Sequence, residues 1–170
     1  MALDFSEIAE RLGSAPDLPA VQETVRTAAR ELTGAHGSTV VLRDGDFCFY
    51  ADEDAISPLW KGQRFPITQC ISGWAMLHGD CAVAPDVYTD PRIPIAAYRP
   101  TFVKSLAVAP IGAGHPSGAM GAIGVYWAVR HVATDAEVAA LEELCSLTAG
   151  ALDRLAGAGL GADSHITRMG

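Results

Sequence analysis

The sequence lacks any run of eighteen consecutive apolar residues, which is about the length needed to cross a bilayer, so no membrane-spanning segment is expected. Its N-terminus carries acidic but no basic side chains, and therefore does not resemble a secretory signal. Basic residues are scarce throughout: 12 Lys and Arg against 20 Asp and Glu give a net charge of -8. Nucleic-acid binding needs a cationic face. We therefore expect a cytoplasmic protein whose partners are neither membranes nor nucleic acids.

Metal-binding and redox signatures are missing as well. The four cysteines, Cys48, Cys70, Cys81 and Cys145, contain no CxxC pair and are far apart in the sequence, which predicts reduced, mostly buried thiols. The histidines include no pair four residues apart and no HExxH motif, so no catalytic metal site is expected. His78 ends a short predicted helix, where a basic residue interacts favourably with the helix dipole. We therefore do not expect it to bind haem.

The residues that are present suit one domain with a substantial core, since 49% of the 170 residues are hydrophobic and 19% are charged. Two amphipathic helices are predicted at the N-terminus, over 4–12 and 17–33, where apolar residues recur every three or four positions. A capping Asp precedes the second helix and a Gly follows it. A third helix is predicted from a Thr-x-x-Glu capping box at Thr134 to about Leu155.

Between these helices the hydrophobic period changes to that of strands. Two β-rich runs, at 38–43 and 46–51, flank Asp44-Gly45, which is a specific hairpin signal. Helices at both ends and hairpins between them predict an α+β fold, an α/β sandwich in which the terminal helices cover one face of an antiparallel sheet. The remaining predicted elements are a short helix at 72–78 and strands at 63–67, 81–87, 105–111 and 119–129.

The segment from 87 to 101, VYTDPRIPIAAYRPT, is irregular. Its three prolines exclude a regular strand or a long helix. It is nevertheless too aromatic and apolar for a solvated linker. Because proline restricts the chain, such a segment can stand over a pocket at low entropic cost. We call residues 87–101 the lid, and expect it to be ordered against one face of the sheet.

Motifs on and around the lid resemble those of GAF domains, most closely the GAF domains of bacterial sensor histidine kinases and related signalling proteins. The resemblance covers residues 16–156, with an N-terminal helix at 1–15 before it and a flexible tail at 157–170 after it. It implies a five- or six-stranded antiparallel sheet and a small-molecule pocket roofed by residues 60–104. The motifs are Ser72-Gly-Trp-Ala75, Pro85-Asp86-Val-Tyr88, Asp90-Pro-Arg92, Ser105-Leu106, Pro110-Ile111 and Gly121 to Trp127.

Six side chains are candidates for binding the ligand of this pocket. The aromatic ones offer a flat apolar face with a polar handle, which suits a planar ligand, although they could equally fill the core beneath the lid. An arginine could hold a carboxylate or phosphate, or could instead fix the lid by pairing with Asp86 or Asp90. The candidates are Trp74, Tyr88, Arg92, Tyr98, Phe102 and Tyr126.

More specialised activities known in the family lack their residues here. The lid stretch Pro94–Tyr98 has no cysteine where methionine sulfoxide reductases of this family carry their nucleophile, and no partner for Cys70 is visible in the sequence. Ile95 occupies the position of the histidine that phytochrome-like domains use, so no bilin is expected. Trp127-Ala128 replaces the Asn-Lys pair of cyclic-nucleotide binders. The cofactor therefore stays unknown, and a reductase-like enzyme is a minor alternative.

The C-terminal helix carries two apolar stripes. One can cover the sheet, and the other, which includes Leu144 and Ala151, needs either the N-terminal helices or a second chain. With the resemblance, this predicts a sensory or regulatory module, not itself an enzyme, that binds an unidentified small molecule and relays a signal through dimerising terminal helices. An output domain of a two-component protein would lie outside the chain. The alternative is a structural dimerisation module without a ligand.

Overall fold

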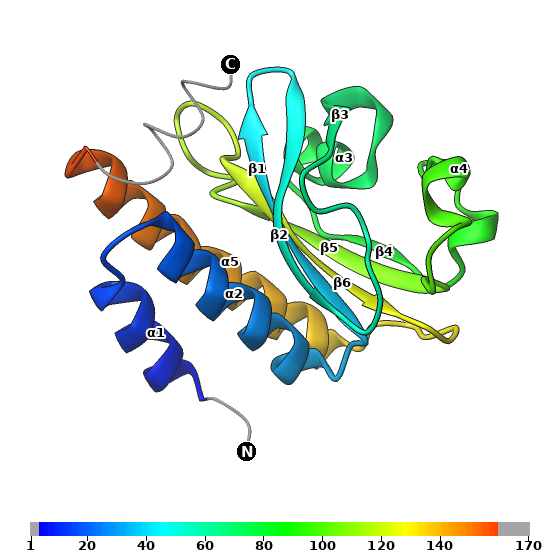
Figure 1. Cartoon of the computed structure of the whole chain (residues 1–170), viewed down its shortest axis with the longest axis horizontal. Helices are drawn as coiled ribbons and strands as arrows, with labels where there is room; N and C mark the ends of the chain where they lie inside the picture. Colours follow the sequence, from blue (N-terminus) through cyan, green and yellow to red (C-terminus); the bar gives the residue numbers. More distant parts are fainter. Residues whose placement is uncertain (1–3, 160–170) are drawn as a thin grey trace.

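The sheet at the centre of the molecule has six antiparallel strands in the order β3-β2-β1-β6-β5-β4 (Figure 1). The computed structural model describes residues 4–159. It confirms the predicted α+β class and the antiparallel sheet. The strands are β1 Gly37–Asp44, β2 Phe47–Ala55, β3 Arg64–Pro66, β4 Ala82–Ala84, β5 Ser105–Ile111 and β6 Gly121–Trp127.

The hairpin predicted at Asp44-Gly45 joins β1 to β2. Gly45 has a φ of 59°, which is the left-handed region that a tight hairpin turn requires. A register shift between Val40 and Val41 interrupts the β1–β2 pairing. The other edge of β1 pairs with β6, which places Thr39 opposite Gly124. Two strands from opposite halves of the sequence therefore form the centre of the sheet.

Three helices cover one face: α1 Phe5–Ser14, α2 Leu18–Thr33 and α5 Asp135–Gly157. Each begins at a residue whose side chain accepts a backbone N–H, and Thr134 and Glu137 form the reciprocal capping box that the sequence predicts. Within the described residues, none of these helices combines the length and apolar character needed to cross a membrane. Residues 160–170 of the predicted tail lie outside the described part of the chain.

The second apolar stripe of α5 is covered within the same chain. Leu144 is fully buried and Ala151 is 4% exposed, in one cluster with residues of α1 and α2. The guanidinium of Arg154 on α5 donates hydrogen bonds to the carbonyls of Leu12 and Ala15, both at 2.8 Å, and so binds the end of α5 to α1. The stripe therefore does not require a second copy of the chain to be buried.

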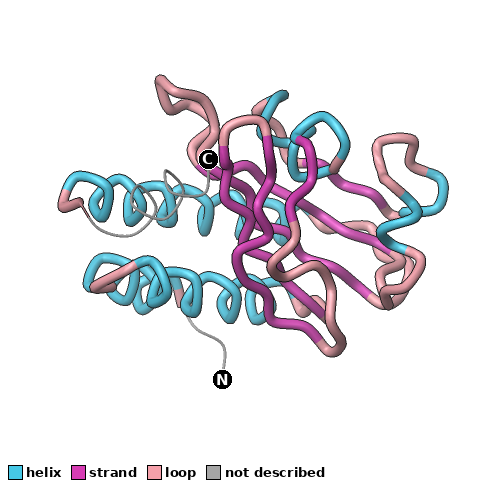
Figure 2. Tube along the Cα trace, turned by 45° about the horizontal axis from the view of Figure 1, so that its top comes forward, coloured by secondary structure: helices cyan, strands magenta, loops and turns pink. Residues whose placement is uncertain are grey.

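The opposite face carries the short elements and the lid (Figure 2). The predicted strand at 81–87 is wrong beyond its first half: only three residues pair with β5 as β4, because the chain then turns at Pro85 into the lid. The lid contains two short helices, each one turn long, where the prolines allow no longer one. The elements are η1 Ile67–Gln69, α3 Ile71–His78, η2 Val87–Thr89 and α4 Ile95–Tyr98.

Candidate functional site

The floor of the site is formed by two buried tyrosines of the sheet, Tyr50 on β2 and Tyr126 on β6, with β1 between them. Tyr126 lies over Gly124 of the same strand, where a Cβ would stand 2.2 Å from the tyrosine oxygen. Its hydroxyl hydrogen-bonds Thr39 Oγ1 at 2.9 Å, and the Tyr50 hydroxyl bonds Ser72 Oγ at 3.0 Å. Burial holds the pKa of both tyrosines above the ordinary value, so both stay protonated. Their polar groups are thus already occupied within the protein.

The wall of the site is Trp60, which is held in place by Glu53. The Glu53 carboxylate accepts the backbone N–H groups of Leu59, Trp60 and Lys61 at 2.8 to 2.9 Å, and so fixes the loop after β2. The Trp60 ring is 4% exposed and lies 5.3 Å from the Tyr126 ring, in an edge-on arrangement. Such contacts favour one fixed orientation of the indole.

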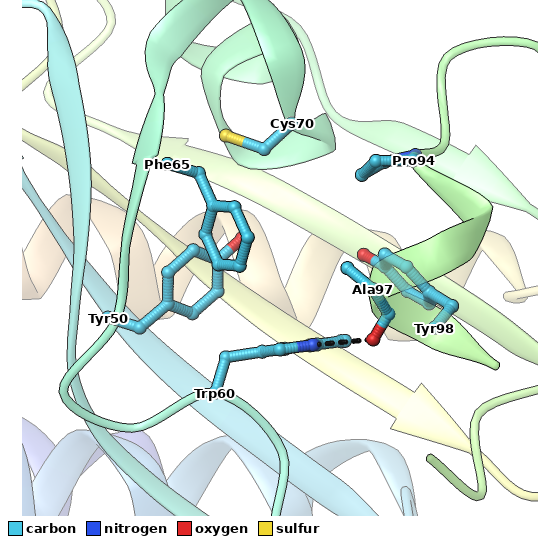
Figure 3. A pocket seen from close by; sticks show the side chains of 7 residues that line it. All are labelled: Tyr50, Trp60, Phe65, Cys70, Pro94, Ala97 and Tyr98. Carbon is cyan, nitrogen blue, oxygen red and sulfur yellow. Dashed lines mark hydrogen bonds between the residues drawn. The ribbon is translucent and has the colours of Figure 1, made fainter. Parts of the chain in front are cut away.

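The lid closes over this wall. The Trp60 Nε1–H donates a hydrogen bond to the carbonyl of Ala97 at 2.9 Å, and the rings of Trp60 and Tyr98 are 4.7 Å apart. Between these side chains is a cavity of about 10 Å³, which is room for a single water molecule. Its lining, drawn in Figure 3, is Tyr50, Trp60, Phe65, Cys70, Pro94, Ala97 and Tyr98.

Tyr98 contributes a hydroxyl group that faces this cavity. The residue is 3% exposed, and burial raises the pKa of its hydroxyl above the ordinary value. Figure 3 shows the oxygen directed into the space between the labelled side chains. Among the described residues no hydrogen bond engages it. A ligand in the cavity would therefore find one available hydroxyl, together with aromatic surface.

The six predicted site residues fall into separate groups. Tyr98 lines the cavity and Tyr126 lies below Trp60, while Phe102 packs against the start of β1 at Gly37. Tyr88 is 49% exposed on the lid and does not line the cavity. The sequence reasoning missed Tyr50, Trp60 and Phe65 in this role. Strand periodicity places Tyr50 on the same face as Cys48, and this was the signal that could have identified it.

Trp74 on α3 and Arg92 on the lid form a separate cluster. The guanidinium of Arg92 lies 4.5 Å from the centre of the Trp74 ring, whose other contact is the stacked ring of His78 at 4.3 Å. Arg92 also donates to both Asp90 oxygens, at 2.6 and 3.0 Å, and to the carbonyl of Val83. Hydrogen bonds from Arg92 hold the pKa of Asp90 below its usual range. These contacts match the alternative in which Arg92 fixes the lid.

Cys70 has a neighbour that the sequence did not reveal. Cys48 on β2 and Cys70, the N-cap of α3, belong to the same core cluster, although 22 positions separate them. The backbone N–H of Gly73 donates to Cys70 Sγ at 3.4 Å. The neighbouring Cys48 thiol is the main cause that lowers the pKa of Cys70, and the pKa of Cys48 is raised. The sequence, in which no partner for Cys70 is visible, therefore did not reveal this neighbouring thiol.

The described residues hold no cluster of three or more His, Cys, Asp or Glu side chains that could bind a metal ion. His78 donates from Nδ1 to the carbonyl of Trp74 at 2.9 Å, as a residue at the end of α3. All four cysteines are free.

Solved structures with a similar fold come from proteins of different functions. The GAF domain of a phosphoenolpyruvate-protein phosphotransferase from Acinetobacter has a TM-score of 0.77 at 13% identity, covering 91% of this chain and 93% of its own. A free methionine-R-sulfoxide reductase from Neisseria meningitidis, solved with its substrate, has a TM-score of 0.72 at 20% identity, covering 87% and 85%. The GAF-B domain of DevS from Mycobacterium smegmatis has a TM-score of 0.66 at 16% identity, covering 91% and 100%.

At these identities the similarity shows the fold alone. A comparison with curated protein sequences finds no match. The family model of the GAF domain, however, matches residues 15–153, which include the sheet, the lid and most of the helix layer. The sheet order, the lid over its second face and this match agree, and the chain belongs to the GAF domain family.

Proposed function

We propose that the protein is a sensory module that binds a small, planar, uncharged molecule between the lid and the sheet. The observation that carries the proposal is the aromatic chamber of Tyr50, Trp60 and Tyr98, which has one unengaged hydroxyl. The GAF family consists of small-molecule-binding sensory and regulatory modules. The chamber is nearly filled in this conformation, so a ligand must displace the lid.

The attachment of the lid supports such a displacement. Residues 94–101 make local hydrogen bonds among themselves and accept one from the nearby Val103 N–H. Within the described residues, the Trp60–Ala97 bond is the only one that connects them to a distant part of the chain. By contrast, the first half of the lid is bound through Asp90, Arg92 and Val83. The second half can therefore move while the first half stays in place, at the cost of one hydrogen bond and the burial of Tyr98.

The chemistry of the chamber argues for an uncharged ligand. Two nearby cations are engaged elsewhere: Arg92 pairs with Asp90, and Arg64 pairs with Asp44 at 2.9 Å. Burying an unpaired charge beside aromatic rings is costly. A flat heterocycle with one hydrogen-bonding atom for the Tyr98 hydroxyl satisfies both the shape and the polarity.

The test combines native mass spectrometry of the purified protein with a thermal-shift screen of neutral planar heterocycles. A ligand at a hundredfold its Kd stabilises the fold by about 2.7 kcal/mol and raises the Tm by several degrees. Tyr98→Phe should weaken that shift, whereas Tyr88→Phe, an exposed residue outside the chamber, should leave it unchanged. If no bound mass and no shift are found, the ligand-free dimerisation module is favoured instead.

We also propose that ligand occupancy reaches an output domain through the helix layer, as part of a cytoplasmic two-component signalling protein such as a sensor histidine kinase, and that two copies associate there. Leu32 on α2 and Leu147 on α5 stay partly exposed in that layer. Light scattering with and without ligand should show a dimer, and Leu147→Glu should weaken it. A monomer at all concentrations would contradict dimerisation. The role is regulatory and not catalytic, and a methionine sulfoxide reductase assay that finds turnover would overturn it.

A further inference from the structure

A nearly buried carboxylate on β2 connects the helix layer to the loop that carries the wall of the chamber. The side chain of Asp52 is 7% exposed, and its two oxygens have different partners. One oxygen accepts a hydrogen bond from the Arg26 guanidinium of α2. The other lies 3.2 Å from Lys61 Nζ and accepts the backbone N–H of Glu53 at 2.9 Å. Asp52 therefore joins α2 to the loop after β2.

A β-bulge explains how two adjacent acids of β2 come to serve opposite sides of the sheet. The register shift in the β1–β2 pairing leaves Ala51 without a partner, and such an extra residue exchanges the two faces of the strand beyond it. Tyr50, before the bulge, lines the chamber. After the bulge, Asp52 reaches an arginine of α2, whereas Glu53 binds the loop of the chamber wall. The bulge thus aims one carboxylate at the helix layer and the next at the chamber.

The Lys61 end of this bridge belongs to the same short loop as Trp60. The Glu53 carboxylate fixes the backbone of that loop by accepting three successive N–H groups. The Trp60 side chain donates to the carbonyl of Ala97 on the lid, and the Lys61 side chain reaches back to β2. The lid and the bridge therefore act on one loop through two adjacent side chains.

The Arg26 end of the bridge is a point where α2 is attached to the sheet. The carbonyl of Arg26 accepts a hydrogen bond from Ser38 Oγ of β1 at 2.6 Å, while its guanidinium binds Asp52. Removing one cation from a nearly buried carboxylate leaves its charge only partly compensated, which is costly. The positions of Lys61 and Arg26 are therefore linked, because both compensate the same charge.

We propose that Asp52 is the positioning residue that couples the lid to α2, through the charged bridge from Lys61 to Arg26. As the route by which occupancy of the chamber reaches the helix layer, the inference rests on the proposed function. The bridge itself requires no ligand. When the lid opens, the loop loses the bond that holds Trp60, and Lys61 can leave the carboxylate. Arg26 is then the remaining cation of the bridge, and the contact of α2 with the sheet changes.

Amide hydrogen exchange of the full chain measures this coupling. The amides of Ala97 and Arg99 are hydrogen-bonded within the lid and report its opening, whereas amides of α5 report global stability. Asp52→Asn should speed exchange at the two lid amides by about fivefold beyond any change in α5. Lys61→Gln, at a side chain that is 60% exposed, should have the same effect on the lid. Lys61→Arg keeps the cation and should exchange like the wild type.

Coupling acts in both directions, so a change at the lid must also be seen at α2. Trp60→Phe removes the hydrogen bond to Ala97 and leaves the bridge residues unchanged. It should shift the NMR signal of the Arg26 side-chain Nε–H. The same substitution in an Asp52→Asn background should leave that signal where Asp52→Asn alone has placed it.

The matched control is Asp54→Asn. Asp54 lies two residues further along β2 and pairs with Arg30 of the same helix at 3.1 Å. Among the described residues, no hydrogen bond or ion pair connects Asp54 to residues 59–61. Asp54→Asn should therefore weaken the attachment of α2 without speeding exchange in the lid.

The proposal is overturned if Asp54→Asn speeds lid exchange as much as Asp52→Asn, if Lys61→Gln leaves lid exchange unchanged, or if the Arg26 signal does not respond to Trp60→Phe. Should Asp52→Asn fail to fold, the comparison of Lys61→Gln with Lys61→Arg still decides. A ligand screen without a hit would remove the proposed function but would leave the exchange result standing, so the two failures are distinguishable.

Discussion

The indole nitrogen of Trp60 and the carbonyl oxygen of Ala97 are 2.9 Å apart, and this hydrogen bond joins two segments that lie 37 positions apart in the chain. It holds the second half of the lid against the wall of the chamber. Lid movement and pocket size depend on this contact, because Trp60 and Ala97 both line the cavity.

Replacing Trp60 should loosen the lid before it unfolds the domain. Trp60→Phe removes the hydrogen bond but keeps aromatic bulk, so we expect a loss of about 1 to 2 kcal/mol in the free energy of unfolding. Trp60→Ala, which also opens a cavity, should cost about 3 to 5 kcal/mol. Urea unfolding measures both, and hydrogen exchange should show faster exchange at the Ala97 and Arg99 amides in Trp60→Phe. Unchanged exchange at these two amides would contradict the conclusion that the Trp60 hydrogen bond holds the lid in place.

Glu53 should be a positioning residue for Trp60. In Glu53→Ala three backbone N–H groups lose their acceptor, and we expect a destabilisation of about 2 kcal/mol. The stability of Glu53→Gln should lie between those of the wild type and Glu53→Ala. Its carbonyl oxygen can still accept from Trp60 and Lys61, but its NH₂ group is a donor and cannot accept the Leu59 N–H. Urea unfolding and Trp fluorescence are the measurements. The control is Glu143→Ala, an exposed residue of α5, which should change little.

The Asp90–Arg92 pair should make the lid sensitive to acid. The pKa of Asp90 is depressed by hydrogen bonds from Arg92, so the pair contributes its full stability above the unfolded-state pKa of about 3.9 and loses it as pH falls through the lower folded-state value. Asp90→Asn should therefore be less stable than the wild type by about 1 kcal/mol at neutral pH, and the difference should vanish in strong acid.

Urea unfolding at descending pH tests this, with Asp80→Asn, an exposed residue in the turn before β4, as the control. A gap between the wild type and Asp90→Asn that persists below the folded-state pKa of Asp90 would show that the carboxylate charge is not its cause.

Replacing glycine by alanine should change the free energy of unfolding in opposite directions at Gly73 and Gly150. A Cβ at Gly73 would stand 1.7 Å from the Ile67 carbonyl oxygen, which belongs to the backbone and cannot give way, so Gly73→Ala should cost about 3 kcal/mol or more. Gly150 lies within α5 with no atom within 4 Å of the same position. Gly150→Ala should stabilise the protein by about 0.5 to 1 kcal/mol. Thermal unfolding of the two variants gives both signs, and equal effects would contradict the argument.

The fold could largely be predicted from the chain because its signals are local. Asp17 and Thr134 mark helix starts that the structure has at those residues, and Asp44-Gly45 marks the hairpin. The length of β4 was overestimated, because Pro85 ends its pairing with β5. A strand of three residues is too short to show a hydrophobic period in the sequence. The apolar faces of the helices were also visible in the sequence. Whether the same chain or a second copy buries Leu144 could not be predicted, because it depends on where α1 and α2 lie.

The candidate site could be predicted only in part. Tyr98 was chosen because an aromatic residue on the lid is notable in itself, and the structure places it at the cavity, whereas Tyr126 contacts Trp60 outside the cavity lining. The contacts of Arg92 with Trp74 and of Trp60 with Ala97 join segments that are distant in the sequence and share no recognisable pattern. No spacing rule applies to such contacts.

The sequence by itself determined the class of the fold, the helix boundaries, the hairpin and the ordered lid, because capping, turn geometry, hydrophobic period and proline act over a few neighbouring residues. Only the tertiary structure decided that Trp60 holds the lid through Ala97, and that Arg92 is engaged by Asp90. The reason is that these contacts depend on how the segments between residues 60 and 104 pack on the sheet. Packing of the whole chain fixes that arrangement, and no local pattern encodes it.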